Sequence, residues 1–238
     1  MIKKLALIIG FIICLSSCGK DYVYRIEGEL SNLEDQTVYA VFEKDNYKVV
    51  DTVACTKPGQ FQIDQNEAGF HCVTIFFADK EHWVTAYLEP GETVKITGDA
   101  NSPLLLQVKG GRTNDKLTAF KKKIAPLLTE LTNLSNSLNS KDLNDTIEET
   151  DIAARLANVN MQLSEEAIRY VKENPNEEAS VVLIQSFFSD PDDTRKIDEL
   201  LALLNPRLKD FYLVKELEHY AGHLKDRQLR SYFLHVKG

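Results

Sequence analysis

The stretch VKGGRTNDKL, residues 108–117, decides the fold, because the hydrophobic pattern of the chain changes within it. Before it, from Tyr22 to about Lys109, the chain contains short runs rich in β-branched and aromatic residues. Turn signals such as Lys57-Pro58-Gly59 separate these runs. Because no helical period lies between the runs, they predict an antiparallel β-sandwich or barrel-like domain over residues 18–110.

After Gly111 the apolar residues recur at alternating spacings of three and four, which is the pattern of a helix with one buried face. The residues of this apolar stripe are Leu117, Phe120, Ile124, Leu127, Leu131, Leu134 and Leu138. Thr113 and Asn114 belong to the residue types that cap a helix at its start. Pro126 lies inside the stripe, so it is expected to kink or split the helix.

Further apolar periodicity predicts a second long helix that ends near Asn174-Pro175. Shorter helices are expected at Glu178–Phe188, 192–204, 206–221 and 224–236. The sequence therefore predicts an α+β chain, in which an all-α bundle or superhelix over residues 111–238 follows the β domain.

The first residues of the chain predict where the protein resides. Lys3 and Lys4 precede an uncharged apolar run, Leu5–Leu15, which is shorter than the roughly 20 residues of a membrane-spanning helix. This combination is typical of a secretory signal peptide, here residues 1–17. Leu15-Ser16-Ser17-Cys18 resembles the bacterial lipobox, which implies cleavage before Cys18 and lipidation of that cysteine. The alternatives are a transmembrane anchor, or a plain secretory signal with a chance cysteine.

A lipidated Cys18 would fix the protein to a membrane of the cell envelope, since several acyl chains together anchor a protein almost permanently. Gly19 follows it instead of Asp, so the inner-membrane retention signal of enterobacterial lipoproteins is absent and the outer membrane is the expected location. The net charge of -8 has the wrong sign for general binding to nucleic acid. We therefore expect a membrane partner through the lipid and no nucleic-acid partner.

The chain has four cysteines, of which two remain for the folded domains. Cys14 lies in the signal peptide and Cys18 is the lipidation site. Cys55 and Cys72 lie in strand-like runs and could form a disulfide in an oxidising envelope. The alternative is two separate buried thiols. Neither belongs to a Cys-x-x-Cys pair, so the sequence contains no thioredoxin-type redox motif.

The sequence contains none of the common catalytic or phosphate-binding motifs, and we expect neither an enzyme nor a cofactor. His219 and His223 are four residues apart and would share one helix face, which is half of a zinc site with Glu216 or Glu218 as further ligands. The favoured interpretation is a solvated histidine pair near a helix end, with Gly222 breaking the helix between the two, and no metal.

One group of aromatic residues has two interpretations. Trp83, Phe76, Phe77 and Tyr87 could form a stacking platform for a sugar or a peptide. Their alternating positions favour core packing for about half of them.

Several motifs together carry a family resemblance. They are Asp51-Thr52-Val53, Gly59–Ile63, Leu88–Asp99, Val108–Leu117, Asn174-Pro175 and Ala179–Leu183. In this order they resemble the N-terminal β domain of unknown function (DUF4369-like) and the helical region of Bacteroidota thiol-disulfide oxidoreductase lipoproteins. In that family a thioredoxin-like domain with a Trp-Cys-x-x-Cys site commonly follows. This sequence ends at Gly238, where that domain would begin, so the resemblance does not carry the reductase activity to it.

The resemblance also implies a modification, because such bacteria O-glycosylate exported proteins at Asp-Ser/Thr followed by an apolar residue. Asp145-Thr146-Ile147 fits this pattern in a polar stretch, so Thr146 is a candidate acceptor. Thr52 also fits but lies in a strand-like run, which makes it the weaker candidate.

Two functions follow as expectations. The first is a non-enzymatic lipoprotein that binds an envelope protein, a peptide or a glycan. The second is an accessory component of periplasmic thiol-disulfide exchange, which would have a separate thioredoxin-like protein as its partner.

Overall fold

The computed structural model describes residues 22–34, 36–45, 47–78, 81–140, 146–188 and 195–236, with side chains left undescribed at 139–140, 146–148 and 225–236. The predicted signal peptide and Cys18 lie outside the described residues. Among the described helices, none combines the length and the apolar composition that crossing a membrane requires.

The N-terminal half forms two four-stranded sheets packed face to face, with strand orders β4-β1-β7-β8 and β3-β2-β5-β6. The strands are β1 Tyr24–Ser31, β2 Thr37–Lys44, β3 Tyr47–Ala54, β4 Gln60–Gln65, β5 Cys72–Phe76, β6 Trp83–Tyr87, β7 Thr93–Asp99 and β8 Gln107–Lys109. All pairs are antiparallel except β1 with β7. The sheets do not close, so the sandwich is confirmed over the barrel.

Alternation along each strand builds the core between the two sheets. In β1 and β2, every second side chain is buried, such as Ile26 and Phe42. Ile75 of β5 and Ile96 of β7 are also fully buried in this cluster. Burying a large apolar side chain contributes about 1.5–3 kcal/mol, so this alternation holds the two sheets together.

The C-terminal half is helical, as predicted. The helices are α1 Arg112–Lys123, α2 Ala125–Ser140, α3 Thr146–Glu173, α4 Glu178–Phe188, α5 Arg195–Leu201 and α6 Tyr212–Val236, with short 3-10 helices η1 Pro103–Leu105 and η2 Pro206–Asp210. The chain breaks between α1 and α2 at Ile124, and Pro126 takes the second position of α2. Proline is tolerated there because the first turn of a helix needs no N–H donor.

Two details of the helical prediction were wrong. The residue that caps α1 is Gly111, without a side-chain hydrogen bond, whereas Thr113 and Asn114 lie inside the helix and are buried. Gly222 does not divide the last segment, because α6 runs unbroken from Tyr212 to Val236.

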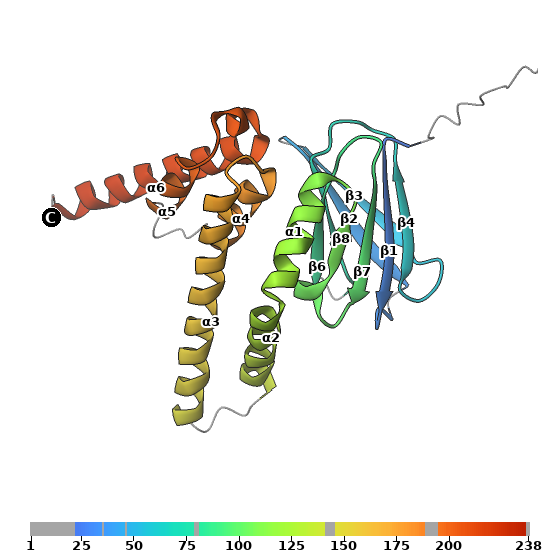
Figure 1. Ribbon diagram of the computed structural model, residues 1–238, viewed down its shortest axis with the longest axis horizontal. Coiled ribbons are helices and arrows are strands. Elements are labelled where there is room, and N and C mark those ends of the chain that lie inside the picture. Colours follow the sequence, from blue (N-terminus) through green and yellow to red (C-terminus); the bar gives the residue numbers. More distant parts are fainter. Residues whose placement is uncertain are drawn as a thin grey trace, which may run out of the picture.

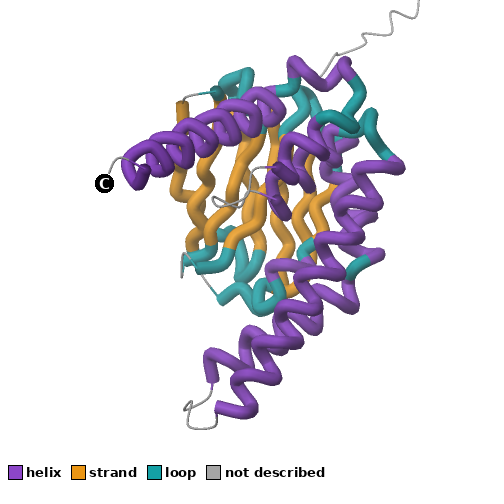
Figure 2. Tube along the Cα trace, turned by 90° about the vertical axis from the view of Figure 1, so that its left-hand side faces the viewer, coloured by secondary structure: helices purple, strands orange, loops and turns teal. Residues whose placement is uncertain are grey.

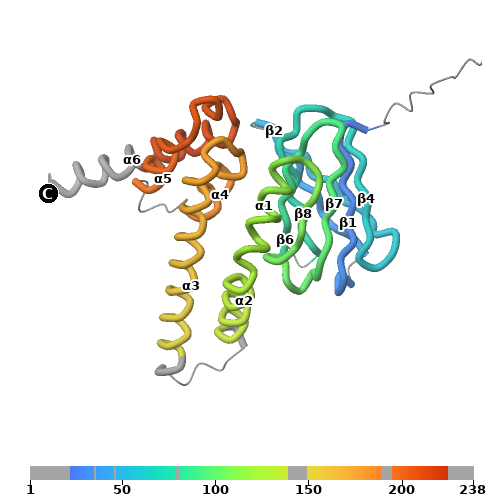
Figure 3. Tube along the Cα trace, viewed as in Figure 1, coloured from blue at the N-terminus to red at the C-terminus, as the bar shows by residue number. Residues whose placement is uncertain are grey.

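The helices gather on one side of the sandwich (Figure 1), with α1 closest to the strands. Viewed from that side, the helices lie in front of the strands (Figure 2), and β4 forms the edge of its sheet opposite β8 (Figure 3). The helices have a second apolar cluster of their own, which includes Ile124, Leu163 and Leu217. The fold therefore consists of two cores that meet along α1.

Helix α1 is joined to both sheets by two buried polar side chains. Asn114 accepts a hydrogen bond from the Tyr87 N–H (2.9 Å) and donates to the Tyr87 carbonyl (2.7 Å), at the end of β6. Thr118 donates to the Val108 carbonyl (2.6 Å) and accepts from the Val108 N–H (3.1 Å), on β8. One turn of helix thus satisfies edge groups of both sheets, which fixes α1 across the open side of the sandwich.

Candidate binding site between the sheet and the helices

The site begins with the outer face of the β3-β2-β5-β6 sheet. On β5, Val73 and Ile75 point into the sandwich core, so Cys72, Thr74 and Phe76 point outward. Strand register places Tyr87, Thr85 and Trp83 of β6 directly beside these three. The outer face therefore carries three cross-strand pairs of side chains. Thr74 and Thr85 form the middle pair, and their hydroxyl groups are hydrogen-bonded to each other at 3.0 Å.

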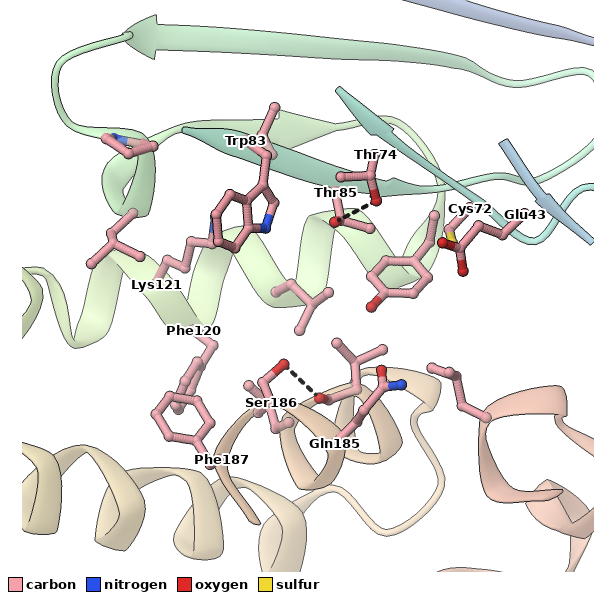
Figure 4. A pocket seen from close by; sticks show the side chains of 18 of the residues that line it. Glu43, Cys72, Thr74, Trp83, Thr85, Phe120, Lys121, Gln185, Ser186 and Phe187 are labelled. Atoms are coloured by element: carbon pink, nitrogen blue, oxygen red, sulfur yellow. Dashed lines mark hydrogen bonds between the residues drawn. The ribbon is translucent and has the colours of Figure 1, made fainter. Parts of the chain in front are cut away.

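Helices α1, α4 and α6 lie opposite this face, and a cavity of about 450 Å³, partly open to solvent, lies between them and the sheet. The walls are Leu117, Phe120 and Lys121 of α1, Val182, Gln185 and Ser186 of α4, and Tyr212, Leu213 and Glu216 of α6. Figure 4 shows the sheet residues on one side of the cavity and the α4 residues opposite. A volume of this size is typical of small-molecule and peptide sites.

Apolar and aromatic side chains form most of the cavity wall. Phe120 contacts Phe187 edge-on, with ring centroids 6.5 Å apart. Trp83 lies 6.1 Å from Phe76 and is 54% exposed. An exposed tryptophan at a cavity supplies a large apolar surface at which a ligand can stack.

Lys121 occupies the end of the cavity next to Trp83 (Figure 4). Its ammonium donates to the Leu106 carbonyl at 3.2 Å, and no carboxylate pairs with it among the described residues. Burial lowers the pKa of Lys121, because desolvation disfavours the charged form. An ammonium in this setting favours a ligand that brings a negative charge.

The opposite end of the cavity is acidic and carries Glu43, Glu216 and two tyrosines. Burial raises the pKa of both Tyr87 and Tyr212, so each keeps its hydroxyl proton. Partial desolvation, and next the Glu43 carboxylate, raise the pKa of Glu216. The buried Tyr212 hydroxyl lies near the Cys72 thiol but has no hydrogen bond of good geometry within the described part.

The possible disulfide is not formed, and neither Cys55 nor Cys72 takes part in a disulfide bond among the described residues. The Cys55 N–H bonds the Gln36 carbonyl at the start of β2, whereas Cys72 pairs with Glu43 near the end of β2. Those two β2 positions are about 23 Å apart at roughly 3.3 Å per residue. A disulfide needs Cα atoms within about 7 Å, so strand register excludes the bond.

The histidine pair lies in the middle of α6 and is exposed. The His219 and His223 Nε2 atoms are hydrogen-bonded at 2.9 Å. Within the described ranges, no group of three His, Cys, Asp or Glu side chains is placed to hold a metal ion. The pair is solvated as expected, but in a continuous helix rather than at a helix end.

The other sequence candidates divide between site and core. Trp83 and Tyr87 line the cavity, whereas Phe77 is buried in the sandwich. Thr146 is the first residue of α3, and its side chain lies outside the described part. Sequence reasoning missed the contributions of α4 and α6. The available signal was β5, which carries Val73 and Ile75 on one face and Cys72 and Phe76 on the other, and apolar residues on both faces imply cover on both.

In the comparisons with known proteins, a match covers the β domain and the start of α1. Residues 24–117 match the family model described as "Domain of unknown function (DUF4369)". The matched segment includes all eight strands and ends within α1, after Asn114. No curated protein matches the chain. No solved structure matches it either.

Proposed function

We propose that this chain, with its DUF4369 domain at residues 24–117, is a non-enzymatic binding module of the cell envelope, anchored by lipid at Cys18. The cavity between the β5–β6 face and helices α1, α4 and α6 is the observation that supports binding. It combines exposed aromatic surface with a few polar groups, which is the usual composition of a ligand site.

The polar groups of the cavity favour binding over catalysis. Burial raises the pKa of the Cys72 thiol to about 12, so it carries almost no thiolate at neutral pH. The Ser186 hydroxyl donates to the Val182 carbonyl at 2.9 Å, and the Thr74 and Thr85 hydroxyls bond each other. Among the described residues, no hydrogen bond joins these hydroxyls to a histidine or a carboxylate that could activate them as nucleophiles.

The test is ligand retention by cavity variants. Ser186 is exposed at the cavity wall, so Ser186→Trp would obstruct the cavity without disturbing a buried position, and Ser186→Ala is the matched control. Each full-length protein is incubated with small molecules extracted from the bacterial envelope, and retained compounds are identified by mass spectrometry.

We expect that wild type and Ser186→Ala retain one or more compounds, and that Ser186→Trp does not retain them. Their masses should be unchanged after prolonged incubation, since no turnover is expected. Equal retention by all three proteins would contradict the cavity as the site, and a changed mass would contradict the absence of catalysis.

A further inference from the structure

The backbone of β6 borders the cavity with unused hydrogen-bonding groups. β6 is an edge strand whose one neighbour in the sheet is β5. The Leu88 N–H donates to the His71 carbonyl, and the His82 carbonyl accepts from the Phe77 N–H. The backbone groups of the even-numbered residues of β6 therefore face β5. Trp83, Thr85 and Tyr87 therefore direct their N–H and C=O groups to the free edge.

Tyr87 shows which kind of group binds at this edge. The Tyr87 N–H and carbonyl are both bonded by the side-chain amide of Asn114, which donates and accepts as a peptide group does. At Thr85 and Trp83, no partner of the edge groups is found within the described residues. The cavity borders this strand, because Trp83, Thr85 and Tyr87 all line it.

The two ends of this edge carry opposite charges. Lys121 lies at the Trp83 end and is the single cationic side chain among the described residues that line the cavity. Glu43 and Glu216 lie at the Tyr87 end, where Glu43 is also paired with Lys48 at 2.7 Å. From Trp83 to Tyr87 the strand spans about 13 Å, at roughly 3.3 Å per residue.

We propose that the cavity binds a short free peptide of about four residues, extended along the free edge of β6 and antiparallel to it. Its carboxylate meets Lys121, its ammonium group faces Glu43 and Glu216, and its backbone pairs with Thr85. This mode is strand addition, in which main-chain hydrogen bonds supply affinity. The charge arrangement selects the antiparallel direction, since the reverse orientation would place like charges together. The inference rests on the proposed function, because it names the ligand of the same cavity.

The probe is a library of free tetrapeptides, applied to the full-length protein, from which the enriched members are resynthesised. Binding is followed through Trp83, which is the one tryptophan of the chain and lies in the cavity. Enrichment by Ser186→Ala and not by Ser186→Trp is expected. No enrichment would overturn the peptide assignment, while retention of other envelope compounds would leave the proposed function standing.

Two variants of Thr85 test the backbone pairing. Thr85→Pro removes the N–H at the free edge, where proline is tolerated, whereas Thr85→Val keeps that N–H and removes only the hydroxyl. We expect Thr85→Pro to bind the enriched peptide at least tenfold more weakly than Thr85→Val does. Circular dichroism should show that both variants are folded. Equal affinities would overturn strand addition.

Capped peptides test the two ends. Amidation of the carboxylate should weaken binding about tenfold in wild type and have little effect in Lys121→Met. Acetylation of the amino group should weaken binding in wild type and much less in Glu216→Gln. A peptide whose acetylated form binds as well as the free form would overturn the short free peptide, and would point to the C-terminal tail of a larger chain.

Discussion

At the residue scale, Asn114 is the side chain on which the site geometry depends most. It is 1% exposed and makes three hydrogen bonds, two to Tyr87 and one to the Gly110 carbonyl at 2.6 Å. It holds α1 at the end of β6, and α1 forms one wall of the cavity.

Asn114→Ala should therefore lower the free energy of unfolding by about 2–4 kcal/mol, because it leaves buried backbone groups of Tyr87 unsatisfied. Urea unfolding measures this loss. The exposed Lys122→Ala in the same helix is the control and should change stability by less than about 0.5 kcal/mol. Similar small effects of both variants would contradict the role given to Asn114.

A second residue-scale prediction concerns Glu177, which receives two hydrogen bonds from Arg112 at 2.7 and 2.8 Å and has a side chain that is 13% exposed. The Arg112 guanidinium lowers the pKa of Glu177 below its ordinary value. A lowered pKa in the folded state contributes stability above the unfolded-state pKa, and that stability is lost as pH falls through the folded value.

Glu177→Gln should thus be less stable than wild type near pH 7 and should lose less stability on acidification. Urea unfolding of both proteins between about pH 7 and pH 3 provides the comparison. Parallel pH profiles would show that the ion pair contributes nothing to acid sensitivity.

At the element scale, helix α6 is continuous at Gly222, whereas the sequence was interpreted as a helix that Gly222 breaks. A Cβ added at Gly222 meets nothing within 4 Å. Gly222→Ala should therefore stabilise the protein by about 0.5–1 kcal/mol, since alanine costs less backbone entropy in a helix. Thermal unfolding measures the change.

Gly110→Ala is the contrasting variant, because Gly110 has a positive φ of 100° and a Cβ there would lie 2.1 Å from the Thr93 carbonyl oxygen. It should be destabilising. If Gly222→Ala lowered the melting temperature as well, the helix would be interrupted at that position.

The elements show which signals in the sequence were sufficient. Alternation defined the strands, and Pro126 located the break between α1 and α2 because its effect on a helix interior is large, about 3 kcal/mol. Gly222 misled the prediction because a helical glycine costs only about 1 kcal/mol, which the packing of Leu217 and Ala221 in the helical core outweighs.

The cavity could not be predicted, because it depends on which sheet face the helices cover. Thr85 and Ser186 are about a hundred residues apart, and no periodicity relates them. Trp83 was recognised as a candidate contact, but its neighbours from α1, α4 and α6 follow from tertiary packing alone. Strand register, likewise invisible in the sequence, separates Cys55 from Cys72.

At the scale of the whole molecule, the proposed lipidation of Cys18 predicts where the protein is found. Cys18→Ser should release the protein from the membrane fraction, whereas Cys14→Ser should not, since only Cys18 occupies the lipobox position. Cell fractionation with mass measurement of the N-terminal peptide tests this. Membrane-bound Cys18→Ser protein would contradict the lipid anchor.

The central claim is that the cavity between sheet and helices is the binding site in the cell. A photo-crosslinking amino acid at Leu104, which is 43% exposed at the cavity wall, tests it most directly. The control position is Gln62, exposed on β4 of the other sheet. The account predicts a discrete adduct from Leu104 that Ser186→Trp abolishes, and none from Gln62. Equal adducts from both positions, or a Leu104 adduct that persists in Ser186→Trp, would contradict it.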